Sequence, residues 1–310
     1  MHSQFKIAFI GLGNLGEPLC HNLTKNGFNV TVTDLNKDSA KRLISEGATW
    51  ADSVADACKD ANVVITALPS VAASRKVVEG ANGVFDNLAS GGIWIEMSTT
   101  DLHDLQRLNA AANAKGIQVL ECPVTGGVHL AESGEITVLV GGDEATAKHV
   151  APILDCMGGQ TIYMGKMGNA SVVKVVTNML AFIHLVAAGE AMMLPAVYGV
   201  DPDATYRAIR ASSGNSFVHE TESKLILSGS YNVKFTMDLA CKDLGLVNGI
   251  VWGVPMIVLI LGTGFYLQLR LGFMPLRKIV YGFQMIGKSR TPGNAADGEI
   301  SPFAALMTAL

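Results

Sequence analysis

A glycine turn between a short apolar strand and a helix constrains the fold of this chain more than any other feature. The turn reads GLGNLG and follows residues 6–10. Its first glycine permits a tight turn, its second lets a diphosphate approach the backbone, and its third permits close packing of helix on strand. Free amides and the positive helix end favour an anion there. The predicted dinucleotide-binding residues of the turn are Gly11, Gly13, Asn14, Leu15 and Gly16.

A carboxylate eighteen residues after Gly16 indicates which dinucleotide binds. Asp34 ends the β-branched segment 29–33. A carboxylate at that strand end can accept hydrogen bonds from ribose hydroxyls and would repel a 2′-phosphate. Asn36 and Lys37 follow closely, so NADP stays open as the alternative. We therefore expect NAD as the cofactor.

Strand and helix patterns alternate through the first half of the chain. Further apolar strands are expected at 62–68, 93–97, 118–124 and 135–140. Alternation of this kind is typical of a parallel sheet with helical crossovers. Near residue 165 the character changes to long apolar helical patterns. The sequence predicts an α/β fold: a Rossmann-type doubly wound parallel sheet over residues 1–163, followed by an all-helical domain over residues 164–246.

Two strand ends point to the same edge of the predicted sheet. Leu68-Pro69-Ser70 ends one strand, and Ser98-Thr99-Thr100 ends another. Both segments are also compatible with ordinary turns or helix caps. Because ligands bind outside the carboxyl ends of such strands, we expect Leu68, Pro69 and Thr99 near the cofactor.

Two further segments carry chemistry. Thr125, Gly126 and Gly127 offer a hydroxyl and accessible backbone amides to a carboxylate, although such a turn is often purely structural. Lys174 and Asn178 lie one helical turn apart among apolar residues. The lysine either extends to water or lines a pocket, where burial would lower its pKa and make it a usable acid or base.

Taken together, these segments resemble the β-hydroxyacid dehydrogenases over residues 1–247. The resembling stretches, GLGNLGEPL, EMSTTDL, ECPVTGGVHLAESGEITVLVGG, KVVTN, Phe235 and Lys242-Asp243-Leu244, occur in the family's order. The resemblance implies hydride transfer between nicotinamide and the alcohol of a small 3-hydroxy acid, of the 3-hydroxyisobutyrate or the tartronate semialdehyde/glycerate type. It implies Lys174 as the catalytic residue, Thr125, Gly126, Gly127 and Asn178 around the substrate carboxylate, and Lys242 over the cofactor. Ala170 departs from the family, which usually has glycine there.

The C-terminal part differs in character. Residues 245–269 contain no charged side chain, and 247–268 are long enough to span a membrane. A buried core helix is the alternative, but glycines and a proline favour a membrane helix. Residues 247–310 resemble the N-terminal part of a sodium:alanine symporter. The basic residues all follow the apolar stretch and would place that side in the cytoplasm, where the dehydrogenase also belongs. We therefore hypothesise a junction of two coding segments that leaves the helical domain incomplete.

Charge and composition indicate which classes of binding partner are not expected. The net charge of -4 gives no reason to expect nucleic-acid binding. Scattered cysteines suggest reduced thiols, and histidines without ligand spacing predict no metal. We expect a cytoplasmic catalytic portion, membrane-anchored if the C-terminal helix is made, and a homo-oligomer if the helical domain is intact. The alternatives are a membrane-associated fusion or fragment related to a sodium:amino-acid symporter with the dehydrogenase part inactive, and a nucleotide-binding sensor.

Overall fold

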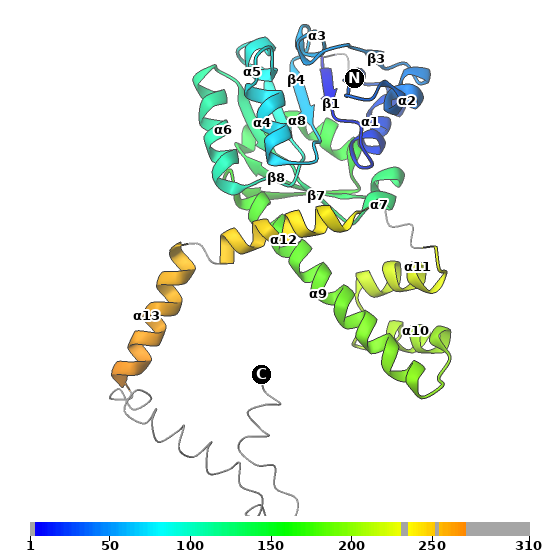
Figure 1. Ribbon diagram of the computed structural model, residues 1–310. Coiled ribbons are helices and arrows are strands. Elements are labelled where there is room, and N and C mark those ends of the chain that lie inside the picture. The colour runs from blue at the N-terminus through cyan, green and yellow to red at the C-terminus, as the bar shows by residue number, and fades with distance from the viewer. Residues whose placement is uncertain (1–3, 231–234, 252–253, 271–310) are drawn as a thin grey trace, which may run out of the picture. The chain divides into compact units, whose positions relative to one another are not determined.

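A nine-stranded sheet organises the first part of the chain (Figure 1). The computed structural model describes residues 4–230, 235–251 and 254–270, which fall in two compact units, residues 1–249 and 250–310. The strand order is β3-β2-β1-β4-β5-β6-β8-β7, with β9 beside β8. The strands are β1 (Lys6–Ile10), β2 (Asn29–Thr33), β3 (Thr49–Trp50), β4 (Val63–Thr66), β5 (Ile93–Glu96), β6 (Gln118–Glu121), β7 (Val124–Thr125), β8 (Thr137–Gly142) and β9 (Gln160–Gly165).

Strands β1 to β6 are parallel, which confirms the Rossmann-type sheet. Strand β8 is antiparallel to β6 and β7, so the Rossmann-type sheet is mostly parallel, with an antiparallel strand toward this edge. The reason is the short link between β7 and β8, since a parallel connection needs a crossover of a dozen or more residues. The strand expected at 118–124 is also interrupted around Pro123, which has no amide hydrogen for the ladder.

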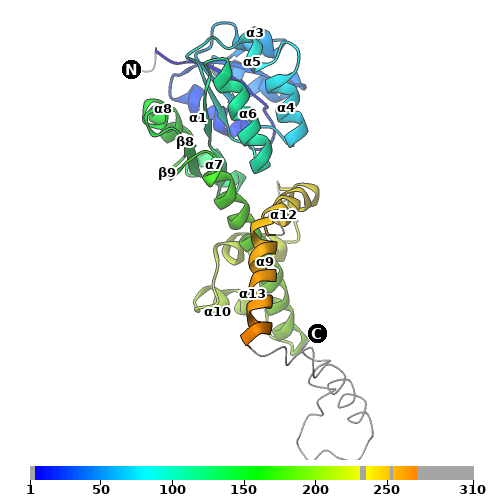
Figure 2. The ribbon, with the colours of Figure 1, turned by 90° about the vertical axis from the view of Figure 1, so that its left-hand side faces the viewer.

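Helices cover both faces of the sheet (Figure 2). Two separate apolar clusters, one on each face, fill the space between helices and strands. The first face carries α1 (Gly16–Lys25), the 3₁₀ turn Lys37–Ala40, α2 (Lys41–Ser45), α7 (Val128–Ser133) and α8 (Glu144–Met157). The second face carries α3 (Val54–Cys58), α4 (Val71–Glu79), α5 (Val84–Asn87) and α6 (Leu102–Ala114). Three-layer packing of this kind buries the strands on both sides and explains their continuous apolar sequences.

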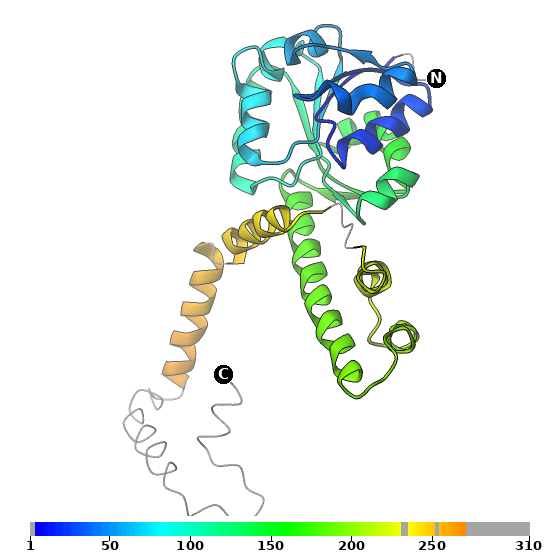
Figure 3. The same cartoon turned by 45° about the vertical axis from the view of Figure 1, so that its right-hand side comes forward.

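A helical part follows the sheet, as predicted. The helix α9 spans Asn169–Val197, and α10 (Pro202–Arg210) and the π turn His219–Ser223 pack beside it (Figure 3). The remaining helices are α11 (Lys224–Leu227), α12 (Met237–Val251) and α13 (Val254–Arg270). Asp201 begins α10 by accepting hydrogen bonds from the amides of Asp203 and Ala204.

The expected membrane helix at 247–268 stays a prediction. Its residues 252 and 253 lie outside the described residues, between the end of α12 and the start of α13. In the described part of the chain, only α9 is long and apolar enough to cross a membrane by length and composition. That criterion is weak, because a core helix of a folded domain also meets it.

Much of the apolar surface of α9 is exposed. Val175 in its first turns is buried, but Leu180, Ile183 and Val186 are about half exposed or more. Exposed apolar stripes of this kind promote association and reduce solubility. An incomplete helical domain, as hypothesised from the sequence, would expose such a stripe.

We predict that Ile183→Gln with Val186→Gln leaves the melting temperature near the wild-type value and lowers binding of a hydrophobic dye. Both side chains are exposed, so polar replacements remove apolar surface without opening the core. Val175→Gln is the matched control on the same helix, and its buried amide should cost about 1–3 kcal/mol of stability. Thermal unfolding and dye fluorescence measure both effects. Equal destabilisation by the exposed pair would show that these side chains are packed in solution.

Candidate active site

The glycine turn between β1 and α1 has the shape that its sequence predicts. Gly11 has a φ of +97°, and a Cβ there would lie 2.4 Å from the carbonyl oxygen of Ala67. A Cβ on Gly16 would lie 2.0 Å from the carbonyl oxygen of Gly11. By contrast, nothing lies within 4 Å of the Cβ position of Gly13. Gly11 and Gly16 therefore serve the packing of the turn, while Gly13 leaves room for a diphosphate, so the turn fits a dinucleotide.

Asp34 is held at the end of β2 against this turn. Its Oδ2 accepts a hydrogen bond from the amide of Leu12 at 2.6 Å, and its Oδ1 accepts one from the amide of Asn36 at 2.8 Å. Each carboxylate oxygen keeps a second lone pair for a ribose hydroxyl. The Lys37 ammonium lies 5.3 Å from the centroid of the Trp50 ring, where a cation is attracted to the aromatic face. The arrangement fits an adenosine ribose.

The ends of β4 and β5 are tied together at the same edge. The amide of Leu68 donates to Ser98 Oγ at 2.8 Å, and Ser98 Oγ donates to Glu96 Oε1 at 2.5 Å. The Leu68 side chain also lies against Gly11. Burial raises the pKa of Glu96, which the hydrogen bonds from Ser74 and Ser98 partly offset. The network brings the predicted cofactor residues Leu68 and Thr99 to one loop cluster beside the glycine turn.

Lys174 and Asn178 on α9 are joined to α12 by a chain of polar contacts. Lys174 Nζ donates to Asn178 Oδ1 at 2.8 Å, and Asn178 Nδ2 donates to Asp243 Oδ2 at 2.6 Å. Asp243 Oδ1 lies 3.2 Å from Lys242 Nζ, which donates to the carbonyl oxygen of Thr99 at 3.2 Å. The predicted residues Lys174, Asn178, Lys242 and Thr99 are thereby brought together in one network.

The surroundings of Lys174 change its protonation. Removal of its ammonium from water lowers the pKa of Lys174 to about 8. The carboxylate of Asp243 opposes this shift, and the positive charge of Lys242 adds to it. A lysine in this range exchanges a proton at near-neutral pH. The environment therefore resembles a pocket rather than a lysine that extends to water.

The other predicted residues take positions around this network. Thr125 ends β7, against which α9 packs, and Gly126 and Gly127 follow with φ values of +124° and +92°. Asn14 and Leu15 lie in the glycine turn, where Leu15 precedes α1 and packs on the core. Pro69 is exposed after β4. Among the described residues no hydrogen bond joins residues 125–127 to Lys174, and the packing of α9 against β7 is what brings the two segments near each other.

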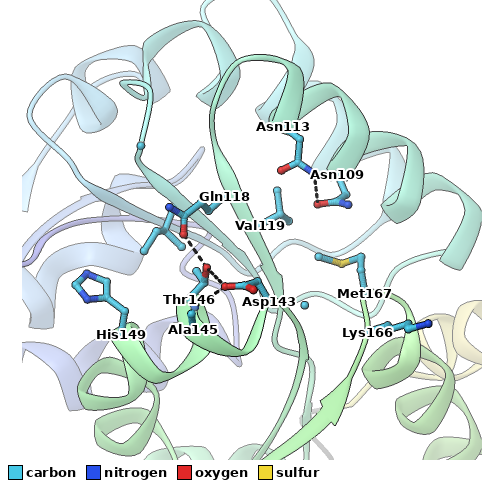
Figure 4. A pocket seen from close by; sticks show the side chains of 13 residues that line it. Asn109, Asn113, Gln118, Val119, Asp143, Ala145, Thr146, His149, Lys166 and Met167 are labelled. Atoms are coloured by element: carbon cyan, nitrogen blue, oxygen red, sulfur yellow. Dashed lines mark hydrogen bonds between the residues drawn. The ribbon is translucent and has the colours of Figure 1, made fainter.

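A hollow in the described part of the chain contains none of the residues of this network (Figure 4). It measures about 760 Å³ and is lined by α6, the start of β6 and the start of α8, with Asn109, Gln118 and His149 among its residues. Thr146 Oγ donates to Gln118 Oε1 across it at 2.7 Å. None of the predicted site residues lines this hollow. It is therefore separate from the candidate active site.

Sequence reasoning missed Asp243 as a site residue. The aspartate adjoins Lys242 in the resembling segment KDL. In the structure Asp243 is 2% exposed, and its side chain connects α12 to α9 through Asn178. Its position one residue after a predicted cofactor lysine was the available signal. Within the described residues, no group of three metal-binding side chains lies close enough to hold an ion.

Comparisons with known proteins show which family the chain is similar to. Residues 6–165 match the model of the NAD binding domain of 6-phosphogluconate dehydrogenase, and residues 168–270 match that of NAD-binding of NADP-dependent 3-hydroxyisobutyrate dehydrogenase. 2-(Hydroxymethyl)glutarate dehydrogenase of Eubacterium barkeri is 32% identical over 79% of this chain and 82% of its own length. Mitochondrial 3-hydroxyisobutyrate dehydrogenase of Rattus norvegicus is 34% identical over 80% of this chain and 76% of its own.

A solved structure supports the same assignment. The 3-hydroxyisobutyrate dehydrogenase of Mycobacterium tuberculosis, determined with L-serine, is 29% identical, covers 81% of this chain and 88% of its own, and superposes with a TM-score of 0.72. The chain belongs to the β-hydroxyacid dehydrogenase family. It is therefore an NAD-dependent dehydrogenase by family, with NADP as the alternative cofactor.

A third match concerns the C-terminal part. Residues 237–310 match the sodium:alanine symporter family. This match overlaps the dehydrogenase match over residues 237–270. The dehydrogenase similarity thus extends beyond Val247, where the sequence resemblance was expected to stop.

We predict that Gly13→Ala weakens NAD binding without lowering the melting temperature, whereas Gly16→Ala destabilises the domain. The Cβ at residue 13 meets open space that a diphosphate would need, and the Cβ at residue 16 meets backbone. We expect an overpacking cost of about 1–3 kcal/mol for Gly16→Ala. Fluorescence titration with NAD and thermal unfolding measure the two effects. Unchanged NAD affinity in Gly13→Ala would contradict binding of the diphosphate at this turn.

Proposed function

We propose that this chain transfers hydride between NAD and the alcohol carbon of a small 3-hydroxy acid, with Lys174 as the catalytic acid and base. The substrates that fit are of the 3-hydroxyisobutyrate or the tartronate semialdehyde/glycerate type. The observation that carries the proposal is the contact chain from Lys174 through Asn178 and Asp243 to α12. It presents a partly buried amine with a lowered pKa beside residues tied to the cofactor edge.

The side chains around Lys174 define its task. Asn178 Oδ1 accepts one hydrogen of the Lys174 amine and so fixes the direction of Nζ. In the oxidation direction the neutral amine takes the proton of the substrate hydroxyl, and in reduction the ammonium returns it. When bound, the nicotinamide accepts or supplies the hydride. The protein contributes orientation and proton transfer.

The substrate carboxylate would bind beside α9. Gly126 and Gly127 adopt positive φ values, which expose successive amides, and Thr125 adds a hydroxyl. Asn178 uses one amide hydrogen for Asp243 and keeps another for the substrate. Three relatives support the substrate class by their names: the two dehydrogenases described above and the NAD-dependent L-serine dehydrogenase of Pseudomonas aeruginosa. The named substrates 2-(hydroxymethyl)glutarate, 3-hydroxyisobutyrate and L-serine all carry a hydroxyl on the carbon two bonds from the carboxyl carbon.

The cofactor would extend along the strand ends. The glycine turn of Gly11, Gly13, Asn14, Leu15 and Gly16 would hold its diphosphate, and Asp34 its adenosine ribose, which favours NAD over NADP. Leu68, Pro69 and Thr99 would contact the nicotinamide half, and Lys242 would close over it from α12. We assign residues 1–163 to cofactor binding and 164–246 to substrate binding and self-association.

The symporter match favours a second candidate function. In this alternative the chain is a membrane-associated fusion or fragment, anchored through 247–268, whose dehydrogenase part is inactive. Carbonate extraction of membranes from expressing cells separates the two. A chain that stays in the pellet and shows no turnover would support the alternative.

We predict that Lys174→Ala lowers kcat for 3-hydroxyisobutyrate oxidation by about 10²–10⁴-fold, because the proton acceptor is lost. The dissociation constant for NAD should change little, since Lys174 lies on α9 and not in the glycine turn. Initial rates of nicotinamide reduction by the detergent-solubilised full chain, beside NAD titrations, measure both. Equal rates in the variant and the wild type would refute the catalytic role.

We predict a specific pH dependence for oxidation. The reaction requires neutral Lys174, so kcat/KM should rise with pH through about 8 and then level off. The Asp243 carboxylate raises the pKa of Lys174, so Asp243→Asn should move this limb to lower pH. Rates measured from pH 6 to 10 at saturating NAD test the sign. A limb that moves upward in Asp243→Asn would contradict the assignment.

A further inference from the structure

Glu121 is a buried carboxylate to which sequence reasoning gave no role. It ends β6 with 1% of its surface exposed. Its carboxylate accepts four hydrogen bonds from the start of α9. The donors are the amides of Gly168, Ala170 and Ser171, at 2.5, 3.1 and 3.0 Å, and the hydroxyl of Ser171 at 2.5 Å. The carboxylate therefore holds the first turn of the helix that carries Lys174.

Two glycines make room for this contact. A Cβ on Gly141 of β8 would lie 2.2 Å from Glu121 Oε1. Gly168 has a φ of +100°, and a Cβ there would lie 2.4 Å from Leu102 of α6. The sheet and α6 thus both approach the carboxylate and the helix start closely. Glycines in β8 and directly before α9 thus leave the space in which Glu121 of β6, the start of α9 and Leu102 of α6 pack together.

The energetics explain why the contact is tight. The first amides of a helix have no partners within the helix, and Ala170 and Ser171 are buried from water. Burial of an ionised carboxylate is costly unless donors satisfy it. Charge-assisted hydrogen bonds and the positive end of α9 meet both needs at once. Displacement of either partner would leave buried polar groups unsatisfied, so the position of the first turn is fixed.

We propose that Glu121 is the positioning residue of the active site, and that its carboxylate places Lys174 by anchoring the first turn of α9 to β6. Lys174 follows Ser171 by three residues on the same helix. The inference rests on the proposed catalytic role of Lys174. The charges that act on Lys174 come from Asp243 and Lys242 on α12, and its hydrogen-bond partner is Asn178 on α9. Glu121 therefore acts on Lys174 by fixing the position of α9, and not by an electrostatic effect of its own charge on the Lys174 amine.

Glu96 is a matched control within the same sheet. It lies opposite Glu121 in the register of β5 and β6, and it is also 1% exposed. Its carboxylate is bonded to Ser74 and Ser98 and not to α9. Glu96→Gln therefore reports the loss of a buried carboxylate at this edge without release of the Lys174 helix.

The direct test is competitive labelling of lysines in the full chain with acetic anhydride between pH 6 and 11, read by peptide mass spectrometry. Exposed Lys6 and Lys25 serve as internal references. Glu121→Gln replaces acceptor oxygen by an NH₂ group that cannot receive the helix amides. Release of the first turn admits water to Lys174, so its labelling midpoint should rise by about one pH unit or more. In Glu96→Gln, which keeps the hydrogen bonds between Glu121 and the start of α9, the Lys174 midpoint should move much less.

Turnover supplies the second readout. A displaced amine should lower kcat in Glu121→Gln by about 10²-fold, with NAD affinity close to that of the wild type. Ser171→Ala removes one of the four hydrogen bonds and should shift the labelling midpoint and kcat in the same directions by less. If Glu121→Gln does not fold, Ser171→Ala decides the question.

The outcomes separate this inference from the proposed function. Folded Glu121→Gln, or Ser171→Ala in its place, with wild-type labelling of Lys174 overturns the positioning role. An equal midpoint shift in Glu96→Gln also overturns it. If the wild-type chain shows no turnover but the labelling midpoint moves clearly more in Glu121→Gln than in Glu96→Gln, the positioning role stands and the proposed function fails. If the wild type shows turnover but the labelling midpoint of Lys174 is unchanged in the variants, the proposed function stands and the positioning role of Glu121 fails.

Discussion

Two buried carboxylates at the ends of adjacent strands determine how the site is built. Glu96 and Glu121 lie in register on β5 and β6. A buried carboxylate must bind donors, and each of these takes them from a different segment. Glu96 holds the loops after β4 and β5, where the cofactor residues lie, and Glu121 holds the start of α9. One edge of the sheet thus orders the cofactor loops and the catalytic helix by the same physical requirement.

The site also depends on a segment distant in sequence. Asp243 and Lys242 of α12 supply the charges that act on Lys174, and Lys242 reaches back to Thr99. Both residues lie in the range where the dehydrogenase and symporter matches overlap. The dehydrogenase network is therefore formed entirely before the apolar stretch at 247–268. A junction downstream of Asp243 removes none of the contacts that join Lys174 to the cofactor edge.

The sequence predicted those features that depend on local pattern. The glycine turn, Asp34 and the spacing of Lys174 and Asn178 follow from periods and turn chemistry within a few residues. The antiparallel direction of β8 and the existence of β9 were not predicted. The direction in which a strand pairs at a sheet edge depends on the path of the connecting segment, which local sequence patterns do not reveal. Glu121 and Asp243 were missed for a related reason. Their partners lie 50 and 65 residues away in sequence, so only the folded chain reveals their roles.

The energetic cost of removing the Lys174 ammonium from water argues that this site carries out chemistry. Partial removal of an ammonium from water is costly, and it lowers the pKa of Lys174 to about 8. A protein that only bound a nucleotide would not need this lysine in a desolvated position next to the cofactor edge, since the glycine turn and Asp34 are sufficient for such binding. Asn178 adds a further constraint, because its one amide group must face both Lys174 and Asp243. A side chain that transfers protons needs a shifted pKa and a fixed orientation, and Lys174 has both.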